Sequence, residues 1–417
     1  MVPELFPFPG LRYQRAALRG ADLADVTAPP YDVIDEEGRA QLEAAHPHNA
    51  VHLILPRDVE PGDRYERART TFEQWRADGI LAPDDEPHLY VYRMAFTDET
   101  GGPRRMIGVV GALELAPLGE GVYAHEKTLA KAKSDRLELL RATRANFDPV
   151  WGLSLAPGLS DVLEPLANGE PAAACVDGDG VEHSLYPVAG EVVDRIRQMI
   201  AAEPLVIADG HHRYETALAY QEERRAAGEE DPGADRIMML VVELADDQLM
   251  VRPIHRLLRN VHHEFRGKLN FVGTVSPMGP NTPDGVRHLL AEMDRTGSMG
   301  IVDGPGLALL TPKLDILKTG LEQLPEALRD VDATRFVLML GRMSLSIELP
   351  EVDYRHDALH VAEMVAKGAA DAAILLRPAT IDQIAMVAAA GLRMAQKTTF
   401  FQPKPLTGLV FRSLDLG

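Results

Sequence analysis

The chain has 417 residues, 46% of them hydrophobic and 25% charged, which is typical of globular proteins and is enough for two or three domains. Its 63 acidic and 43 basic side chains give a formal charge of −20, which disfavours nonspecific binding to nucleic acid and to anionic membranes. The single cysteine, Cys175, excludes an intramolecular disulfide framework and fits a reducing compartment. We find no basic and then apolar leader and no run of about 18 apolar residues, so we expect a soluble, cytoplasmic protein.

The first part of the chain, residues 1–115, alternates stretches typical of strands and of helices, and we predict an N-terminal α/β part. The segment His46–Pro56 is predicted to be a polar loop that enters a strand. Its three histidines could suggest a metal site, but no carboxylate has matching spacing, so ordinary loop histidines are favoured. Apolar residues at helical spacing predict a helix over 65–78. Two strands, 88–96 and 106–115, are expected to form a hairpin.

A polar stretch over residues 122–133 precedes a predicted helix that Ser134 would cap. Glu126 lies between a histidine and a lysine, directly before a basic cluster. A carboxylate in this position can accept a proton from a hydroxyl while the cations hold phosphate. The alternative is a surface glutamate beside a solvated basic helix face. The candidates here are Glu126 as a catalytic residue, His125 and Thr128 as substrate contacts, and Lys127, Lys131 and Arg136 as phosphate contacts.

The most informative stretch is Pro204–Tyr220. A short apolar run, then Asp209 and Gly210, then apolar residues at helical spacing predict a strand, a tight turn and a helix. The polar residues that follow the turn would lie at a helix N-terminus, where backbone N–H groups and the helix dipole favour a phosphate. Arg213 would add a bidentate guanidinium contact.

Two other interpretations of this stretch remain open. Asp209 can be only a helix cap, with Gly210 relieving turn strain and the next three residues forming a solvated first turn. Alternatively, His211 and Glu215 lie one helical turn apart and can share a metal. The candidate catalytic residues are Asp209, His211 and His212, and the candidate phosphate-binding residues are Gly210 and Arg213.

The central part is expected to cover residues 116–264. Towards its end a strand is predicted over 250–258, where Arg252 and His255 either line a cavity as substrate contacts or lie at an exposed edge. The α/β pattern continues through a C-terminal part, residues 265–417.

Within residues 265–417, strands are also predicted over 336–340 and 344–349. A polar and aromatic loop follows closer to the C-terminus. Lys397 and Lys404 flank an aromatic loop, and our hypothesis is that they fold back over the site and contact substrate.

Several short stretches together resemble the bacterial and archaeal family known as domain of unknown function 1015. The motif Asp-Gly-His-His-Arg of residues 209–213 carries most of the resemblance, and His125-Glu126-Lys127-Thr128 precedes it. Other stretches that resemble the family are Ala28–Asp32, His46–Pro56, Arg252–Arg256, Lys397–Lys404 and Thr407-Gly408-Leu409. The resemblance therefore covers nearly the whole chain.

Through this motif the family is similar to the ParB/sulfiredoxin superfamily, which includes free L-serine kinases. The resemblance implies a mixed α/β chain with a ParB/sulfiredoxin-like catalytic domain between N- and C-terminal α/β parts. It also implies ATP or ADP with Mg²⁺, an amino acid substrate, Glu126 as the base for the serine hydroxyl, and residues 209–213 as the phosphate loop. Asp209 is a candidate magnesium ligand, and the same site could take phosphate from phosphoserine in reverse.

Three classes of function remain open: this phosphotransferase, a metal-dependent hydrolase that uses His211, His212 and Glu215, and a non-catalytic nucleotide-binding regulatory protein of ParB type. Without a Gly-x-x-x-x-Gly-Lys-Ser/Thr loop or a protein-kinase catalytic set, neither usual phosphotransferase scaffold is in use. The expected partners are a nucleotide and a small molecule, with no nucleic acid and no membrane. A homo-oligomer is left open.

Overall fold

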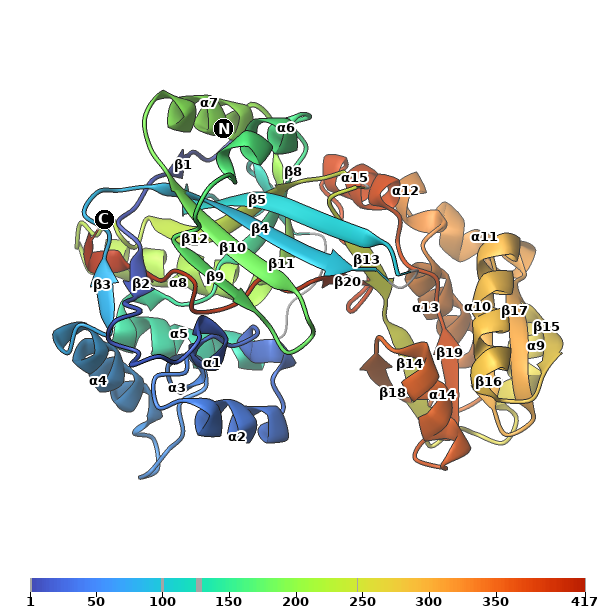
Figure 1. The fold of residues 1–417 in the computed structure, drawn as a ribbon. Helices are drawn as coiled ribbons and strands as arrows, with labels where there is room; N and C mark the ends of the chain where they lie inside the picture. Colours follow the sequence, from blue (N-terminus) through green and yellow to red (C-terminus); the bar gives the residue numbers. More distant parts are fainter. Residues whose placement is uncertain (1, 99–100, 125–129, 246, 417) are drawn as a thin grey trace. The chain divides into compact units, whose positions relative to one another are not determined.

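The structure, a computed structural model, describes residues 2–98, 101–124, 130–245 and 247–416. Its helices and β-sheets confirm the predicted mixed α/β class (Figure 1). The described chain divides into two compact units. The first contains the residues up to Ala124, the stretch that ends at Leu249, and the residues from Pro403 onward, whereas Met250–Gln402 belong to the second.

A nine-stranded mixed sheet forms the centre of the first unit, in the order β6-β11-β8-β12-β5-β4-β10-β9, with β1 paired to β5. Most neighbours are antiparallel, but β6 pairs in parallel with β11, and β8 with β12. The strands are β1 (Leu5–Phe6), β4 (Leu89–Thr97), β5 (Pro103–Glu114), β6 (Val122–Ala124), β8 (Val150–Ser154), β9 (Ala173–Val176), β10 (Glu182–Val188), β11 (Leu205–Asp209) and β12 (Arg236–Glu243).

Short two-stranded pairs and helices complete this unit. The pairs join β2 (Leu11–Tyr13) to β3 (Leu81–Pro83) and β7 (Ala145–Asn146) to β21 (Arg412–Ser413). The helices are α1 (Leu23–Val26), η1 (Tyr31–Val33), α2 (Glu36–Ala45), α3 (Val51–Ile54), α4 (Arg64–Ala77), α5 (Ala130–Thr143), α6 (Leu159–Leu163), η2 (Glu164–Leu166), α7 (Glu191–Ala202), α8 (His211–Ala226) and η3 (Leu414–Leu416).

Apolar residues of the central strands and of α7 form the core of the first unit. Leu205 and Ile207 of β11 are fully buried, and so are Ile196 and Ile200, which lie four residues apart on α7. This spacing puts both isoleucines on one helix face. Each buried side chain of this kind contributes roughly 1.5–3 kcal/mol relative to an exposed one.

The sheet joins parts of the chain that the sequence analysis placed in separate domains. Strands β4 and β5 of the predicted N-terminal part pair with β10 and β12 of the predicted central part. The predicted boundaries at residues 115 and 264 therefore do not coincide with the ends of the compact units. In addition, the chain from Pro403 onward returns to the first unit.

In the second unit a six-stranded sheet has the order β15-β17-β16-β19-β14-β18, and β13 pairs separately with β20. The strands are β13 (Met250–Pro253), β14 (His255–Arg259), β15 (Gly273–Gly279), β16 (Met299–Asp303), β17 (Gly306–Pro312), β18 (Glu351–Arg355), β19 (Ala372–Leu375) and β20 (Thr399–Gln402). The helices are α9 (Phe265–Val272), α10 (Pro283–Thr296), α11 (Leu314–Glu322), α12 (Glu326–Arg329), α13 (Asp332–Met343), α14 (Ala358–Ala366) and α15 (Ile381–Ala389).

Four local predictions were wrong. The strand predicted to follow the His46 loop is the short helix α3, and the helix expected from Ser134 begins at Ala130. The strand predicted over 336–340 lies inside helix α13, where Phe336 and Met339 are buried while the intervening Val337 is 53% exposed. This burial pattern has the helical period of 3.6 residues, which a short apolar run cannot reveal on its own. No strand forms over 344–349.

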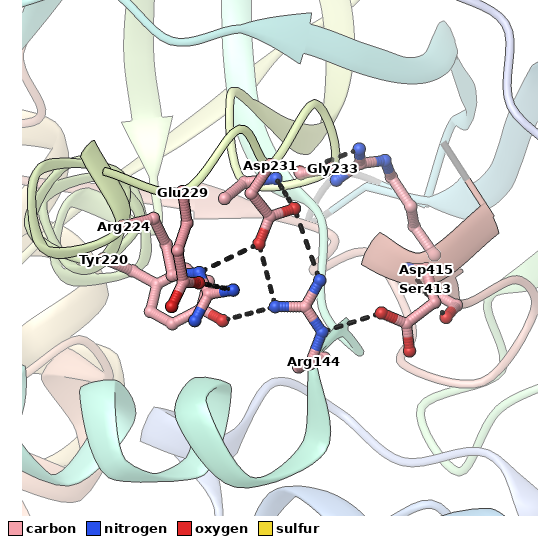
Figure 2. A network of polar contacts seen from close by, with 10 residues as sticks. Arg144, Tyr220, Arg224, Glu229, Asp231, Gly233, Ser413 and Asp415 are labelled. Atoms are coloured by element: carbon pink, nitrogen blue, oxygen red, sulfur yellow. Dashed lines mark hydrogen bonds and ion pairs between the residues drawn. The ribbon is translucent and has the colours of Figure 1, made fainter. Parts of the chain in front are cut away.

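An ion-pair network fixes the C-terminal segment to helices α5 and α8 of the first unit (Figure 2). Arg144, directly after α5, donates to Asp231 at 2.8 and 3.3 Å, to the Tyr220 hydroxyl at 2.7 Å and to Asp415 at 2.7 Å. Asp231 also pairs with Arg224 of α8 at 3.2 Å. Because Asp415 lies at the C-terminal end, this network holds the last turn of the chain against both helices.

Candidate functional site

The predicted strand, turn and helix are confirmed at β11, Gly210 and α8. Gly210 is the N-cap residue of α8 and has φ = +86°, which favours glycine. A Cβ atom at this position would lie 2.9 Å from Nε of Arg213. The tight turn therefore needs glycine both for its backbone angle and for the guanidinium packed against it.

Asp209, the last residue of β11, lies between two cations. Its Oδ2 accepts a hydrogen bond from Nη2 of Arg213 at 2.7 Å, and its Oδ1 accepts one from Nζ of Lys404, also at 2.7 Å. All three side chains are at most 13% exposed. Burial opposes ionisation of Asp209, but the charges of Lys404 and Arg213 outweigh it and hold its pKa far below the usual range.

Arg213 is held in place from two sides. Besides its bond to Asp209, its Nη1 donates to the carbonyl oxygen of Pro149 at 2.5 Å. Burial lowers the pKa of Arg213, but nearby carboxylates, Asp209 first and then Asp148, raise it above its ordinary value. The guanidinium therefore stays charged although it is buried.

A second buried carboxylate, Asp148, belongs to this cluster and was missed in the sequence analysis. The Thr407 hydroxyl donates a short hydrogen bond to Asp148 Oδ1. Burial raises the Asp148 pKa to about 6, against the opposing charges of Arg213 and Arg136. The only local signal was an aspartate before Pro149 at the entry to a buried strand, which is not specific.

Arg136 of α5 is a buried cation near Asp148. Its Nη1 donates to the Ile54 carbonyl at 2.7 Å, and its guanidinium lies 4.2 Å from the ring centre of Tyr31. Arg136, Asp148, Arg213 and Thr216 are polar residues lining a cavity of about 60 Å³ at α5 and α8.

The two histidines of the motif occupy the first two positions of α8. His211 is buried, with 8% of its surface exposed, and His212 is half-buried.

The remaining predicted contacts lie in the second unit. Arg252 is on β13 and His255 on β14. His255 is 1% exposed, and its Nδ1 accepts the Leu376 N–H at 3.2 Å. Burial lowers the His255 pKa to about 4, so this histidine is neutral at pH 7 and supports the core of its unit. The Lys397 carbonyl accepts a hydrogen bond from Arg256 at 2.9 Å.

The predicted base and its neighbours, His125, Glu126, Lys127 and Thr128, lie outside the described residues. Lys131 is in the first turn of α5. The structure thus brings together Asp209, Gly210, Arg213 and Lys404, with Arg136 and Asp148 nearby. It does not test the role of Glu126.

The Asp209 carboxylate, with the partners that it has in the structure, does not fit a direct magnesium ligand. Magnesium in proteins is held by carboxylate oxygens together with water and substrate phosphates. Both oxygens of Asp209 already accept hydrogen bonds from cations. Among the described residues, no group of three or more His, Cys, Asp or Glu side chains could hold a metal. The structure therefore lends no support to Asp209 as a direct magnesium ligand or to a hydrolase metal site on His211, His212 and Glu215.

A protein-family model matches residues 5–341, which is most of the chain. The family is described as "Protein of unknown function (DUF1015)". The chain belongs to this family. The sequence resemblance is thereby confirmed. No curated protein matches the chain.

Solved structures of low similarity are also found. A free serine kinase in complex with AMP is 15% identical, with a TM-score of 0.38 over 71% of this chain and 87% of that one. A conserved hypothetical protein from Pyrococcus furiosus is 13% identical, with a TM-score of 0.37 over 74% and 97%. A C-terminally truncated SbnI from Staphylococcus aureus is 11% identical, with a TM-score of 0.34 over 72% and 86%. At these values the likenesses carry no inference about chemistry.

None of the described helices combines the length and apolar character that a membrane span requires.

Proposed function

We propose that this DUF1015 protein is a nucleotide-dependent phosphotransferase. It would transfer a phosphoryl group between ATP or ADP and the hydroxyl of a small acceptor, with free L-serine as the acceptor and O-phosphoserine as the product. The same site would also run the reverse reaction. The observation that carries the proposal is the buried group of Arg213, Asp209 and Lys404 at the N-terminal end of α8.

The charges of this group suit the phosphates of a nucleotide. Phosphoryl transfer depends on cations placed around the phosphates before the reaction begins. Arg213 and Lys404 are fixed within hydrogen-bond distance of one carboxylate, at the positive end of a 16-residue helix. A phosphate oxygen can replace Asp209 as the partner of either cation. Asp209 would thus hold both cations in position until the nucleotide binds.

The proton of the acceptor hydroxyl needs a base. By the sequence resemblance this base is Glu126. In the forward reaction the acceptor O–H bond breaks and its proton moves to the Glu126 carboxylate. The acceptor oxygen forms a bond to the terminal phosphorus as the bond from that phosphorus to the nucleotide oxygen breaks. Magnesium stays a prediction from the resemblance, and no step is assigned to it.

The test is phosphate transfer between nucleotide and L-serine, measured as O-phosphoserine with ATP or ADP and magnesium, and as nucleotide product in reverse. We expect transfer by the wild-type protein and its loss in Glu126→Gln and Asp209→Asn. Glu138→Gln is the matched control, because this glutamate is exposed on α5 and pairs with Arg141.

The outcomes separate the classes of function. Absence of transfer in both directions by folded protein would refute the serine reaction. A nucleotide-dependent rise in melting temperature without turnover would favour the regulatory class. A stoichiometric transition metal in the purified protein, with hydrolysis that needs no nucleotide, would favour the hydrolase class.

A further inference from the structure

One stretch that the sequence analysis singled out, His46–Pro56, has no part in the proposed phosphotransfer. In the structure it borders a hollow of about 320 Å³ in the first unit. We call this feature the α2–α4 hollow. Its lining residues are Glu43 of α2, Pro47, His52 of α3, Pro56, Arg57, and Arg67 and Thr71 of α4. The volume is within the range of small-molecule sites, and the two prolines have restricted backbones.

The charge balance of the α2–α4 hollow favours an anion. Glu43 is its single lining carboxylate, and it already accepts hydrogen bonds from Arg57 at 2.7 and 2.8 Å and from Arg39 at 3.2 Å. Arg67 forms no ion pair with any residue that the structure describes. The lining of the hollow therefore includes a positive charge, that of Arg67, which the ion pairs of Glu43 do not offset.

His52 adds an uncharged hydrogen-bonding group to the lining of the α2–α4 hollow. Its Nε2 is buried and has no hydrogen-bond partner among the described residues. Burial lowers the pKa of His52 and so favours the neutral ring, in which one nitrogen is an acceptor. A hydrogen bond to the His46 backbone uses the ring N–H, which leaves Nε2 as the acceptor. A buried acceptor without a partner costs free energy that a ligand donor would recover.

We propose that the α2–α4 hollow is a binding site for a small hydroxylated anion, a phosphate monoester or a carboxylate. The anionic group would pair with Arg67 and Arg57, and a ligand hydroxyl would donate to Nε2 of His52. The proposal does not rest on the phosphotransferase function. Helix α3 carries both His52 and Ile54, whose carbonyl accepts from Arg136 of the candidate site, so a ligand here contacts the helix that orients Arg136.

The experiment is isothermal titration calorimetry of the full chain at pH 7 with glycerol 3-phosphate, and with glycerol, glycerate and inorganic phosphate as comparisons. Glycerol 3-phosphate and glycerate separate the two anion types. We expect at least one of them to bind saturably at one site, more tightly than glycerol or inorganic phosphate. Loss of one charge-assisted hydrogen bond should weaken this binding at least about tenfold in Arg67→Gln.

Arg69→Gln is the matched control, since this arginine lies on the same helix but pairs with Glu66 and Glu73. It should bind like the wild type. His52→Phe should bind the hydroxylated anion no better than inorganic phosphate. The proposal is overturned if neither anion gives saturable binding, if Arg67→Gln binds as the wild type does, or if glycerol binds equally well.

Discussion

The buried carboxylate of Asp148 makes a quantitative prediction about stability that does not depend on the function. Its pKa in the folded protein is about 6, compared with an ordinary aspartate value of about 3.9. Between these values the folded state binds more protons than the unfolded state, so the free energy of unfolding falls as pH rises through this window. Above pH 6 the full cost of the ionised carboxylate is present.

Asp148→Asn should remove this cost. A difference of roughly 2 pKa units corresponds to roughly 3 kcal/mol at most. The asparagine carbonyl still accepts the hydrogen bond from Thr407, so the main change is the lost charge. We expect the variant to be more stable than the wild type at pH 7 by up to roughly 3 kcal/mol, and the two proteins to converge near pH 4.

The assay is urea unfolding followed by tryptophan fluorescence between about pH 4 and pH 8. The chain has two tryptophans, Trp75 and Trp151, and both are buried in the first unit with Asp148, so the signal reports that unit. Asp85→Asn, at an exposed loop position, is the control and should track the wild type at every pH. A stability difference that is the same at pH 4 and pH 7 would refute the reasoning.

Two further variants test the phosphate loop. Lys404→Met should weaken nucleotide binding about tenfold or more, because a charge-assisted hydrogen bond is lost. Lys318→Met on α11 is the control and should leave nucleotide binding unchanged. Equal nucleotide affinities of Lys404→Met and the wild type in calorimetry would contradict the role of Lys404. Gly210→Ala should lower the free energy of unfolding by roughly 2 kcal/mol and displace Arg213, whereas Gly228→Ala has a similar positive φ of 73° but no neighbour within 4 Å and should cost less. Equal urea midpoints of Gly210→Ala and Gly228→Ala would contradict the predicted contact between the added Cβ atom and Arg213.

How much of the site the sequence could predict depends on the distance along the chain between its parts. The strand, the turn at Gly210 and helix α8 are continuous, so local rules for apolar spacing and glycine were sufficient. The contacts of Asp209 with Lys404 and of Asp148 with Thr407 span 195 and 259 residues. No local pattern encodes such pairs. Lys404 was proposed because it flanks an aromatic loop near the C-terminus, and Asp148 was missed.

The fold was predictable at the level of class for a similar reason. Alternating strand-like and helix-like stretches indicate an α/β chain, but backbone pairing between distant strands decides which segments share a sheet. Thus β4 and β5 join β10 and β12 across the boundary expected at residue 115. The apolar run at 336–340 shows the same limit at short range, since packing against one helix face decided its state.

The path of the chain through its two units leads to a last prediction. The second unit leaves the first after Leu249 and returns at Pro403, and its end residues Met250 and Gln402 are directly paired between β13 and β20. Paired residues of antiparallel strands have Cα atoms only about 4.5–5.5 Å apart. A short Gly-Gly link can therefore replace residues 250–402 without straining the first unit.

This deletion variant should fold, because the first unit keeps its own core and its C-terminal segment. Lys404 and Thr407 would still reach Asp209 and Asp148, and the buried Arg412 would keep its backbone partners, the carbonyls of Gly233 and Arg236. We expect a cooperative urea transition in tryptophan fluorescence. A chain cut after Gln402 is the contrasting variant: it lacks those contacts and should lose most of that stability. If the deletion variant is unfolded while the cut chain folds, the first unit does not depend on its C-terminal segment as these contacts require.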